Sequence, residues 1–133
     1  MATDERKSVR YGGEGLYEDA LVAYVEEQDF VTIVKAKDFL DKWMETKGRK
    51  VFYLGQNMAI WAGMSSSFCA ILLAVIDKGR VRVSTCSDLT YAADGCILHF
   101  PLVGKKIPKQ GYEKPHWLPV CLRPVKKGPG QEE

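Results

Sequence analysis

The sequence contains very little histidine or asparagine and no long hydrophobic run. Its two histidines stand in no nucleophile or metal motif, and neither a P-loop nor a GxGxxG sequence occurs. The longest strongly apolar run, residues 68–76, is too short to span a bilayer, and the charged N-terminus lacks the apolar block of a signal peptide. We therefore predict a cytoplasmic, non-enzymatic protein with no cofactor and no membrane contact. The isolated aspartates at 77, 88 and 94 leave a Mg²⁺-dependent nuclease as the one enzymatic alternative.

The cysteines lack the paired CxxC spacing of a zinc finger. Two cysteines and two histidines have the chemistry of a tetrahedral zinc set, but their spacing matches no standard finger, so no metal site is predicted: Cys96, His99, His116 and Cys121. Cys86 and Cys96 lie on two strands that we expect to pair, where they form either a disulfide or two small buried residues. The single asparagine, Asn57, favours a thermophilic source, and in hyperthermophiles intracellular disulfides occur.

Charge is divided unevenly along the chain, although the net charge is only +2. Residues 14–45 hold nine acidic residues against three lysines, whereas residues 46–127 hold thirteen Lys and Arg against four acidic residues. A division of this kind places a positive field on one face of a small protein, and a nucleic acid is the partner that best suits it. The alternative interpretation is a solvated surface on which the charges cluster by chance.

The length suits one domain, and with 46% hydrophobic residues the chain can bury a core. We predict a flexible arm over residues 1–13 with Gly12 and Gly13 as its hinge, a single α+β domain over 14–125, and a flexible tail over 126–133. Hydrophobic periodicity and turn residues predict the elements of that domain. Helices are expected at 16–28, 36–47, 56–62 and 65–77, strands at 30–34, 51–54, 80–85 and 96–103, and an edge strand within 116–125.

The order of elements from 36 to 103 resembles the winged helix-turn-helix superfamily. The resemblance rests on small and apolar residues at the positions where such a segment needs close helix crossing and a tight turn. These residues are Met58, Ala59, Ala62, Gly63, Met64, Cys69 and Leu72. The resemblance implies an α+β fold with a winged-helix-like core, to which this chain adds an N-terminal helix and strand and a basic C-terminal extension.

The sequence departs from the superfamily on the second helix, which in that family enters the major groove of DNA. Its exposed face would present Ser65, Ser66, Ser67, Ala70 and Ile71, with no Arg, Lys, Asn or Gln before residue 78. Serine discriminates weakly between bases. The alternative is that residues 68–76 form only the core helix of an α+β domain.

Basic residues gather in three separate stretches: at 47–53 and 105–117 they precede or lie between aromatic residues, whereas at 78–82 Arg80 and Arg82 alternate with valines. Single-strand binders use this combination, because bases stack on rings while cations neutralise phosphates. The candidate nucleic-acid-binding residues are Arg49, Lys50, Tyr53, Trp61, Ser65, Ser66, Ser67, Lys78, Arg80, Arg82, Lys105, Lys106 and Lys109.

These observations predict a non-enzymatic nucleic-acid-binding protein that contacts mainly phosphates, with DNA as the preferred ligand. One alternative is single-stranded DNA binding by stacking on Tyr53, Trp61 and Trp117. The other is a protein–protein adaptor in which the acidic helix 16–28 and the apolar helix 65–77 form a homodimer interface.

Overall fold

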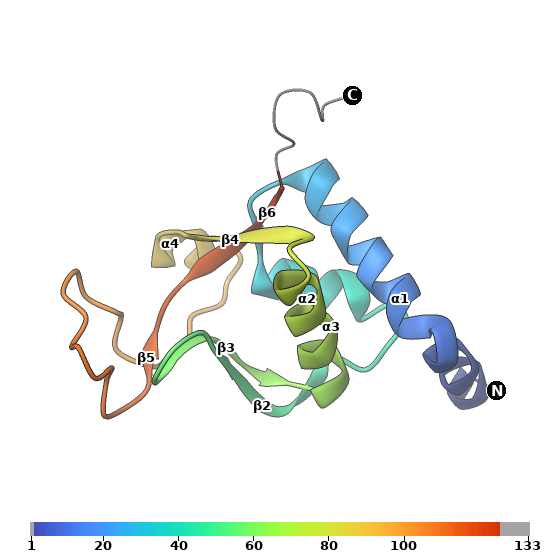
Figure 1. The fold of residues 1–133 in the computed structure, drawn as a ribbon, viewed down its shortest axis with the longest axis horizontal. Helices are drawn as coiled ribbons and strands as arrows, with labels where there is room; N and C mark the ends of the chain where they lie inside the picture. Colours follow the sequence, from blue (N-terminus) through green and yellow to red (C-terminus); the bar gives the residue numbers. More distant parts are fainter. Residues whose placement is uncertain (1, 126–133) are drawn as a thin grey trace.

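The computed structural model describes the backbone of residues 2–125 and the side chains of residues 15–125. Over these residues the chain has an α+β fold with two three-stranded sheets (Figure 1). The helices are α1 (Ala2–Gln28), α2 (Ile33–Leu40), α3 (Ser66–Asp77) and α4 (Asp88–Ala92). The strands are β1 (Val31–Thr32), β2 (Lys47–Tyr53), β3 (Met58–Met64), β4 (Val81–Thr85), β5 (His116–Trp117) and β6 (Val120–Pro124). None of the helices in this part of the chain combines the length and apolar character needed to cross a membrane.

The two N-terminal helices differ in extent from their predictions. Helix α1 begins at Ala2, so it includes most of the segment for which an arm was predicted; the flexibility of that segment stays a prediction. The strand predicted over 30–34 is reduced to two residues, because Thr32 caps α2 by accepting a hydrogen bond from the Lys35 backbone N–H at 3.1 Å. Helix α2 ends at Leu40, well before the predicted end at 47. The predicted tail at 126–133 lies outside the described residues.

The first sheet has the strand order β1-β6-β4, and all its pairs are antiparallel. The C-terminal strand that we predicted at an edge is therefore central, with Val31 and Val83 on either side of Leu122. Prolines are compatible with this position because Pro119 precedes the strand and Pro124 ends it. The strand predicted over 96–103 is wrong: only one isolated bridge forms there, between Leu102 and Trp117, and β4 pairs with β6 instead.

The second sheet has the strand order β2-β3-β5, with β2 at an edge. Strand β3 occupies the place of the predicted helix 56–62, so that prediction is wrong. The apolar sequence from Met58 to Met64 suits a buried strand as well as a helix, and here β2 and β5 satisfy its backbone from both sides. Gly63 does take a positive φ, of 71°, but at the end of a strand. The segment before α3 is thus a strand and not the first helix of a helix-turn-helix.

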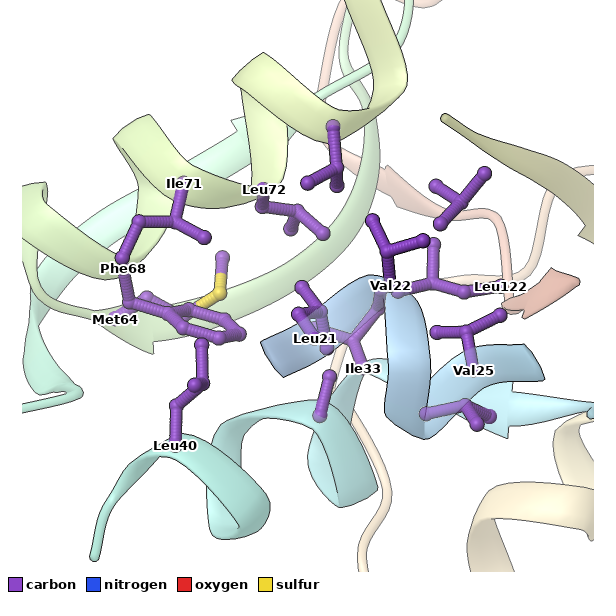
Figure 2. Packing of buried hydrophobic residues seen from close by; sticks show 14 of the residues in the cluster. Leu21, Val22, Val25, Ile33, Leu40, Met64, Phe68, Ile71, Leu72 and Leu122 are labelled. Carbon is purple, nitrogen blue, oxygen red and sulfur yellow. The ribbon is translucent and has the colours of Figure 1, made fainter. Parts of the chain in front are cut away.

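The main hydrophobic core lies between α1, α2 and α3 and the inner face of the first sheet (Figure 2). Helix α3 contributes Phe68, Ile71, Leu72 and Val75, all nearly or fully buried. Ile71, which we predicted on an exposed face, is therefore in the core. The buried side of α3 is packed within this chain, whereas Leu73 on its outer side is exposed, and the adaptor alternative stays a prediction.

A second cluster forms around Tyr91 of α4 and Trp117 of β5. The Tyr91 hydroxyl donates a hydrogen bond to the Val120 carbonyl at 2.6 Å and accepts one from the Ile33 backbone N–H at 3.0 Å. Burial raises the pKa of this hydroxyl far above its usual range. Through these two hydrogen bonds, Tyr91 connects the beginning of α2 to β6, the central strand of the first sheet.

Candidate nucleic-acid interface

A groove of about 430 Å³ lies between β2 and α3. Four consecutive residues of the strand form one side, and a stripe of α3 at helical spacing forms the other. The lining residues are Lys50, Val51, Phe52, Tyr53, Ser66, Cys69, Ala70 and Leu73. Three of the predicted site residues, Lys50, Tyr53 and Ser66, are brought together here.

The orientation of α3 follows from its cap and its buried face. The Ser65 hydroxyl accepts a hydrogen bond from the Phe68 backbone N–H at 3.0 Å and donates one to the Glu45 carbonyl at 2.7 Å. Because Phe68 and Leu72 are fully buried, the residues on the opposite side, Ser66 and Leu73, face outward. Ser65 is thus occupied as a helix cap, whereas Ser66 and Ser67 are exposed.

The start of β2 is held tightly against the junction between β3 and α3. The Ser65 backbone N–H donates a hydrogen bond to the Thr46 carbonyl at 2.8 Å, and the buried Thr46 hydroxyl donates one to Asp41 at 2.7 Å. Gly48 follows, and a Cβ atom at this position would lie 2.6 Å from the Met64 carbonyl oxygen. This close approach fixes the end of the groove at which β2 begins.

Strand β2 carries the first exposed basic cluster, formed by Lys47, Arg49 and Lys50. None of the three forms an ion pair with an acidic residue in the described part of the chain. Burial raises the pKa of the Cys69 thiol, and the positive charge of nearby Lys50 opposes that increase. Lys50 thus places its charge at the groove itself, where an anionic ligand would meet it.

The second predicted cluster, at 78–82, is mostly engaged within the protein. Lys78 contacts the buried Glu18 carboxylate at 3.0 Å, and Arg80 contacts Asp19 at 2.8 Å and Glu18 at 3.8 Å. The Arg82 side chain donates to the Pro124 carbonyl at 3.0 Å. Lys78 and Arg80 therefore balance acidic residues of α1, and only Arg82 of this cluster has no acidic partner among residues 15–125.

The third cluster, formed by Lys105, Lys106 and Lys109, lies on an exposed loop that is fixed to the β2–β3 turn. The Asn57 side chain donates to the Tyr112 carbonyl at 2.7 Å, and the Tyr112 ring stacks on His116 with 3.7 Å between the ring centroids. Figure 1 shows the β2–β3 hairpin extending away from α1 towards this loop. The β2–β3 hairpin thus carries the first basic cluster and contacts the loop that carries the third. Neither of these clusters has an acidic partner among the described residues.

The aromatic residues that we predicted for base stacking have different environments. Tyr53 is 42% exposed and lines the groove, whereas Trp117 is 1% exposed and cannot stack on a ligand. Trp61 is half-buried and stacks on Tyr91, with 5.2 Å between the ring centroids. Phe52, which we did not predict, lines the groove next to Tyr53.

Half of the outer stripe of α3 was missed: Ser66 and Ala70 were predicted on the exposed face, but Cys69 and Leu73 were not, although the sequence contains a signal for them. Ser66, Cys69, Ala70 and Leu73 follow helical spacing and alternate with the buried residues of the same helix. The sequence did not show that β2 lies opposite this stripe, because we expected a helix over residues 56–62 to follow β2, where the structure has strand β3.

Neither a metal site nor a disulfide is formed in the described residues. No group of three or more His, Cys, Asp or Glu side chains within this part of the chain could hold a metal ion, so the potential zinc ligands are not brought together. All four cysteines are free thiols, including Cys86 and Cys96.

No family model, curated protein or solved structure matches this chain. The winged-helix relation therefore stays a prediction from the pattern of residues 36–103, in which the expected first helix of the helix-turn-helix is strand β3. The groove and the two basic clusters are the features of this chain that bear on its function.

Proposed function

We propose that this protein is a non-enzymatic nucleic-acid-binding protein, with DNA as its preferred ligand, that holds an unpaired strand along β2. The observation that carries the proposal is the groove between β2 and α3, which combines Lys50 with two aromatic residues, Phe52 and Tyr53. The proposal joins phosphate contacts, which the charge pattern favours, with the stacking contacts of a single-strand binder.

The phosphate contacts are assigned to exposed cations that have no acidic partner among the described residues. Lys47, Arg49 and Lys50 lie on β2, and the lysines at 105, 106 and 109 lie on the loop beside the β2–β3 turn. A cation that already pairs with a carboxylate gains less from a phosphate, because the existing pair must be broken first. This is why Lys78 and Arg80 are omitted from the proposed interface.

The base contacts are assigned to the groove. Its lining combines aromatic and aliphatic surface from Phe52, Tyr53 and Leu73 with the short side chains of Ser66 and Ala70. An unpaired base can place its flat face on such a surface, and each stacked base contributes about 1–3 kcal/mol. In a duplex the base faces are covered by their neighbours, so only the backbone would reach this part of the protein.

The test is a fluorescence anisotropy titration with oligonucleotides of about 15 nucleotides, a length within the known site sizes of single-strand binders. Single-stranded DNA, the same sequence as a duplex, and the matching RNA are compared at low and at physiological salt. We expect the single strand to bind more tightly than the duplex, with affinity falling steeply as salt rises.

Two variants locate the binding site. Lys50→Ala should reduce the salt slope by roughly 0.7, the value for one single-strand phosphate contact. Tyr53→Ala should cost about 1–3 kcal/mol of single-strand affinity with the salt slope unchanged. Lys35→Ala, an exposed lysine on α2 away from the groove, serves as the matched control and should bind normally.

Three outcomes would change the proposal. Absence of binding to all three ligands at low salt would refute it. If duplex and single strand bind with equal affinity, and Tyr53→Ala changes neither affinity, the protein binds through phosphate contacts only. Normal binding by Lys50→Ala and Tyr53→Ala together would place the interface elsewhere on the molecule.

A further inference from the structure

Cys86 and Cys121 lie on the same face of the first sheet. In the β4–β6 ladder, Ser84 is opposite Cys121 and Thr85 is opposite Val120. The ladder continues beyond β4, because the Cys86 backbone N–H donates to the Pro119 carbonyl at 2.9 Å. Residues two apart on a strand share a face, so the Cys86 side chain is the diagonal neighbour of Cys121.

The two thiols are close enough to interact. The Cys86 and Cys121 thiols lie near each other, and both lie near the buried hydroxyl of Tyr91. Burial, and after it the contact with Cys86, raises the pKa of Cys121 to about 12. Cys86 is half-buried, whereas Cys121 is 2% exposed. A reagent from solvent would therefore reach Cys86 first.

These cysteines stand where a long segment leaves and rejoins the first sheet. Between them, and before β6 begins at Val120, the chain contains only the short helix α4, the two-residue strand β5 and the irregular chain that carries the third basic cluster. Figure 1 shows this segment extending from the ends of β4 and β6 to the far side of the molecule. A cross-link between the two positions would close the segment at its base.

We propose that Cys86 and Cys121 form a reversible disulfide that closes the 87–120 segment where it joins the sheet. The pairing differs from the Cys86–Cys96 disulfide that the sequence suggested, because the strand containing residue 96 was expected to pair with β4 and does not. Cys121 is the residue that β6 brings beside Cys86. The inference does not depend on the proposed nucleic-acid binding.

The reaction is thiol–disulfide exchange with a low-molecular-weight disulfide as the oxidant. The Cys86 thiolate attacks one sulfur of the oxidant, which forms a mixed disulfide and releases one small thiol. The Cys121 thiolate then attacks the Cys86 sulfur and releases the second small thiol. Two protein thiols are oxidised and one small disulfide is reduced to two thiols, each of which takes up one of the protons lost by the cysteines.

The cross-link would stabilise the fold mainly by restricting the unfolded chain, because it closes a loop of more than thirty residues. We therefore expect the oxidised protein to unfold at a higher temperature than the reduced protein. Because Cys121 is buried and ionises only at high pH, we also expect the second step to accelerate as pH rises, with the mixed disulfide at Cys86 accumulating at neutral pH.

The test uses the folded full chain incubated with oxidised glutathione, followed by thiol counting and mass spectrometry without reductant. At high pH two of the four thiols should be lost, with a mass decrease of two hydrogens and full recovery on reduction, whereas at neutral pH the glutathione adduct at Cys86 should be found. Trypsin leaves Cys86 and Cys96 in one peptide, so digestion before Asp88 and Asp94 is needed to separate them. The linked peptides should then contain Cys86 and Cys121.

Variants exclude the other pairings. Cys96→Ser should still form the cross-link, whereas Cys86→Ser should retain its three remaining thiols and show no shift in melting temperature between oxidising and reducing conditions. Cys86→Ser is preferred to a Cys121 variant because residue 121 is in the core. A Cys86–Cys96 linkage, or a glutathione adduct at Cys86 that never resolves even at high pH, would overturn the proposal.

Discussion

At the scale of single residues, the turn between α1 and β1 shows how one side chain stabilises an unfavourable backbone conformation. Asp29 and Phe30 have positive φ values of 53° and 50°, a conformation that residues other than glycine rarely adopt. Arg123 donates to both carboxylate oxygens of Asp29, at 2.9 and 3.0 Å, and its guanidinium lies 3.9 Å from the centroid of the Phe30 ring. Arg123 therefore ties the turn to the central strand β6.

The Arg123–Asp29 pair predicts a pH-dependent stability. The hydrogen bond from Arg123 lowers the pKa of Asp29, so the contribution of the pair is fully present above the unfolded pKa of about 3.9 and is lost as pH falls through the lower folded value. Arg123→Gln should lower the urea midpoint at pH 7 and have a much smaller effect at pH 2. Equal destabilisation at both pH values would show that the effect comes from the ring contact with Phe30 and not from the charge.

Gly48 gives a second prediction at this scale. A Cβ atom there would lie 2.6 Å from the Met64 carbonyl oxygen and 2.7 Å from the Ser65 Cα, and both are backbone atoms that cannot move independently. Gly48→Ala should cost about 1–3 kcal/mol in the free energy of unfolding measured with urea. Gly104→Ala, where a Cβ meets nothing within 4 Å, is the control and should be nearly neutral. A neutral Gly48→Ala would contradict the close packing of β2 against the β3–α3 junction.

At the scale of elements, helices that are defined by neighbouring residues were predicted from the sequence, whereas strands that are defined by pairing with distant residues were missed. Helix α3 was predicted within one residue, because its cap at Ser65 and its apolar spacing are local. Strand β3 was mistaken for a helix, because its apolar run fits both structures and its pairing partner β5 is more than fifty residues away. The pairing of β4 with β6 was missed for the same reason, since the two strands are also far apart in the sequence.

The candidate site shows the same division. Lys50, Tyr53 and Ser66 could be selected from the sequence because exposed cations, aromatics and helix-face residues have local signals. The sequence also selected Lys78 and Arg80, but it could not show that Glu18 and Asp19, some sixty residues earlier, contact them. Charge counts along the chain therefore overestimated the free basic surface.

The loop that carries the third basic cluster gives a prediction at the scale of elements. Gly111 has a φ of 80°, and a Cβ atom there would lie 2.5 Å from the Gln56 Cβ on the β2–β3 turn. Gly111→Ala should displace the loop from the hairpin and weaken oligonucleotide binding severalfold, because Lys105, Lys106 and Lys109 then lose their fixed position beside β2.

Gly95→Ala is the matched control for this loop variant. It has the same φ of 80°, but a Cβ atom there meets nothing within 4 Å. It should share the backbone strain of about 1 kcal/mol without reducing oligonucleotide affinity. Equal loss of binding in both variants, measured by anisotropy, would show that general destabilisation and not loop position is responsible.

At the scale of the whole molecule, the uneven charge of the sequence becomes two different arrangements. The acidic residues of α1 neutralise the cations that follow α3, through the buried Glu18 and its neighbour Asp19. The cations of β2 and of the 104–115 loop have no such partner within residues 15–125. The charge asymmetry thus stabilises the fold on one side and leaves a positive hairpin and loop on the other.

Glu18→Gln tests this arrangement. The change removes the acidic partner of Lys78 and one partner of Arg80, and since both cations are partly exposed we expect a loss of about 1–2 kcal/mol in the free energy of unfolding. The freed cations should also raise the affinity for oligonucleotides at low salt. Glu26→Gln, at an exposed position of the same helix, is the control for the change in net charge. An identical effect of both variants would contradict the network.

The central claim is that nucleic acid binds along β2 and in the groove facing α3. It is tested most directly by following backbone amide signals in ¹H–¹⁵N NMR spectra while a short single-stranded oligonucleotide is added at low salt. We expect shifts concentrated in residues 47–53, 66–73 and 104–114, with residues 18–28 and 78–80 unchanged. Shifts centred on α1 and residues 78–80, or no shifts at all, would contradict it.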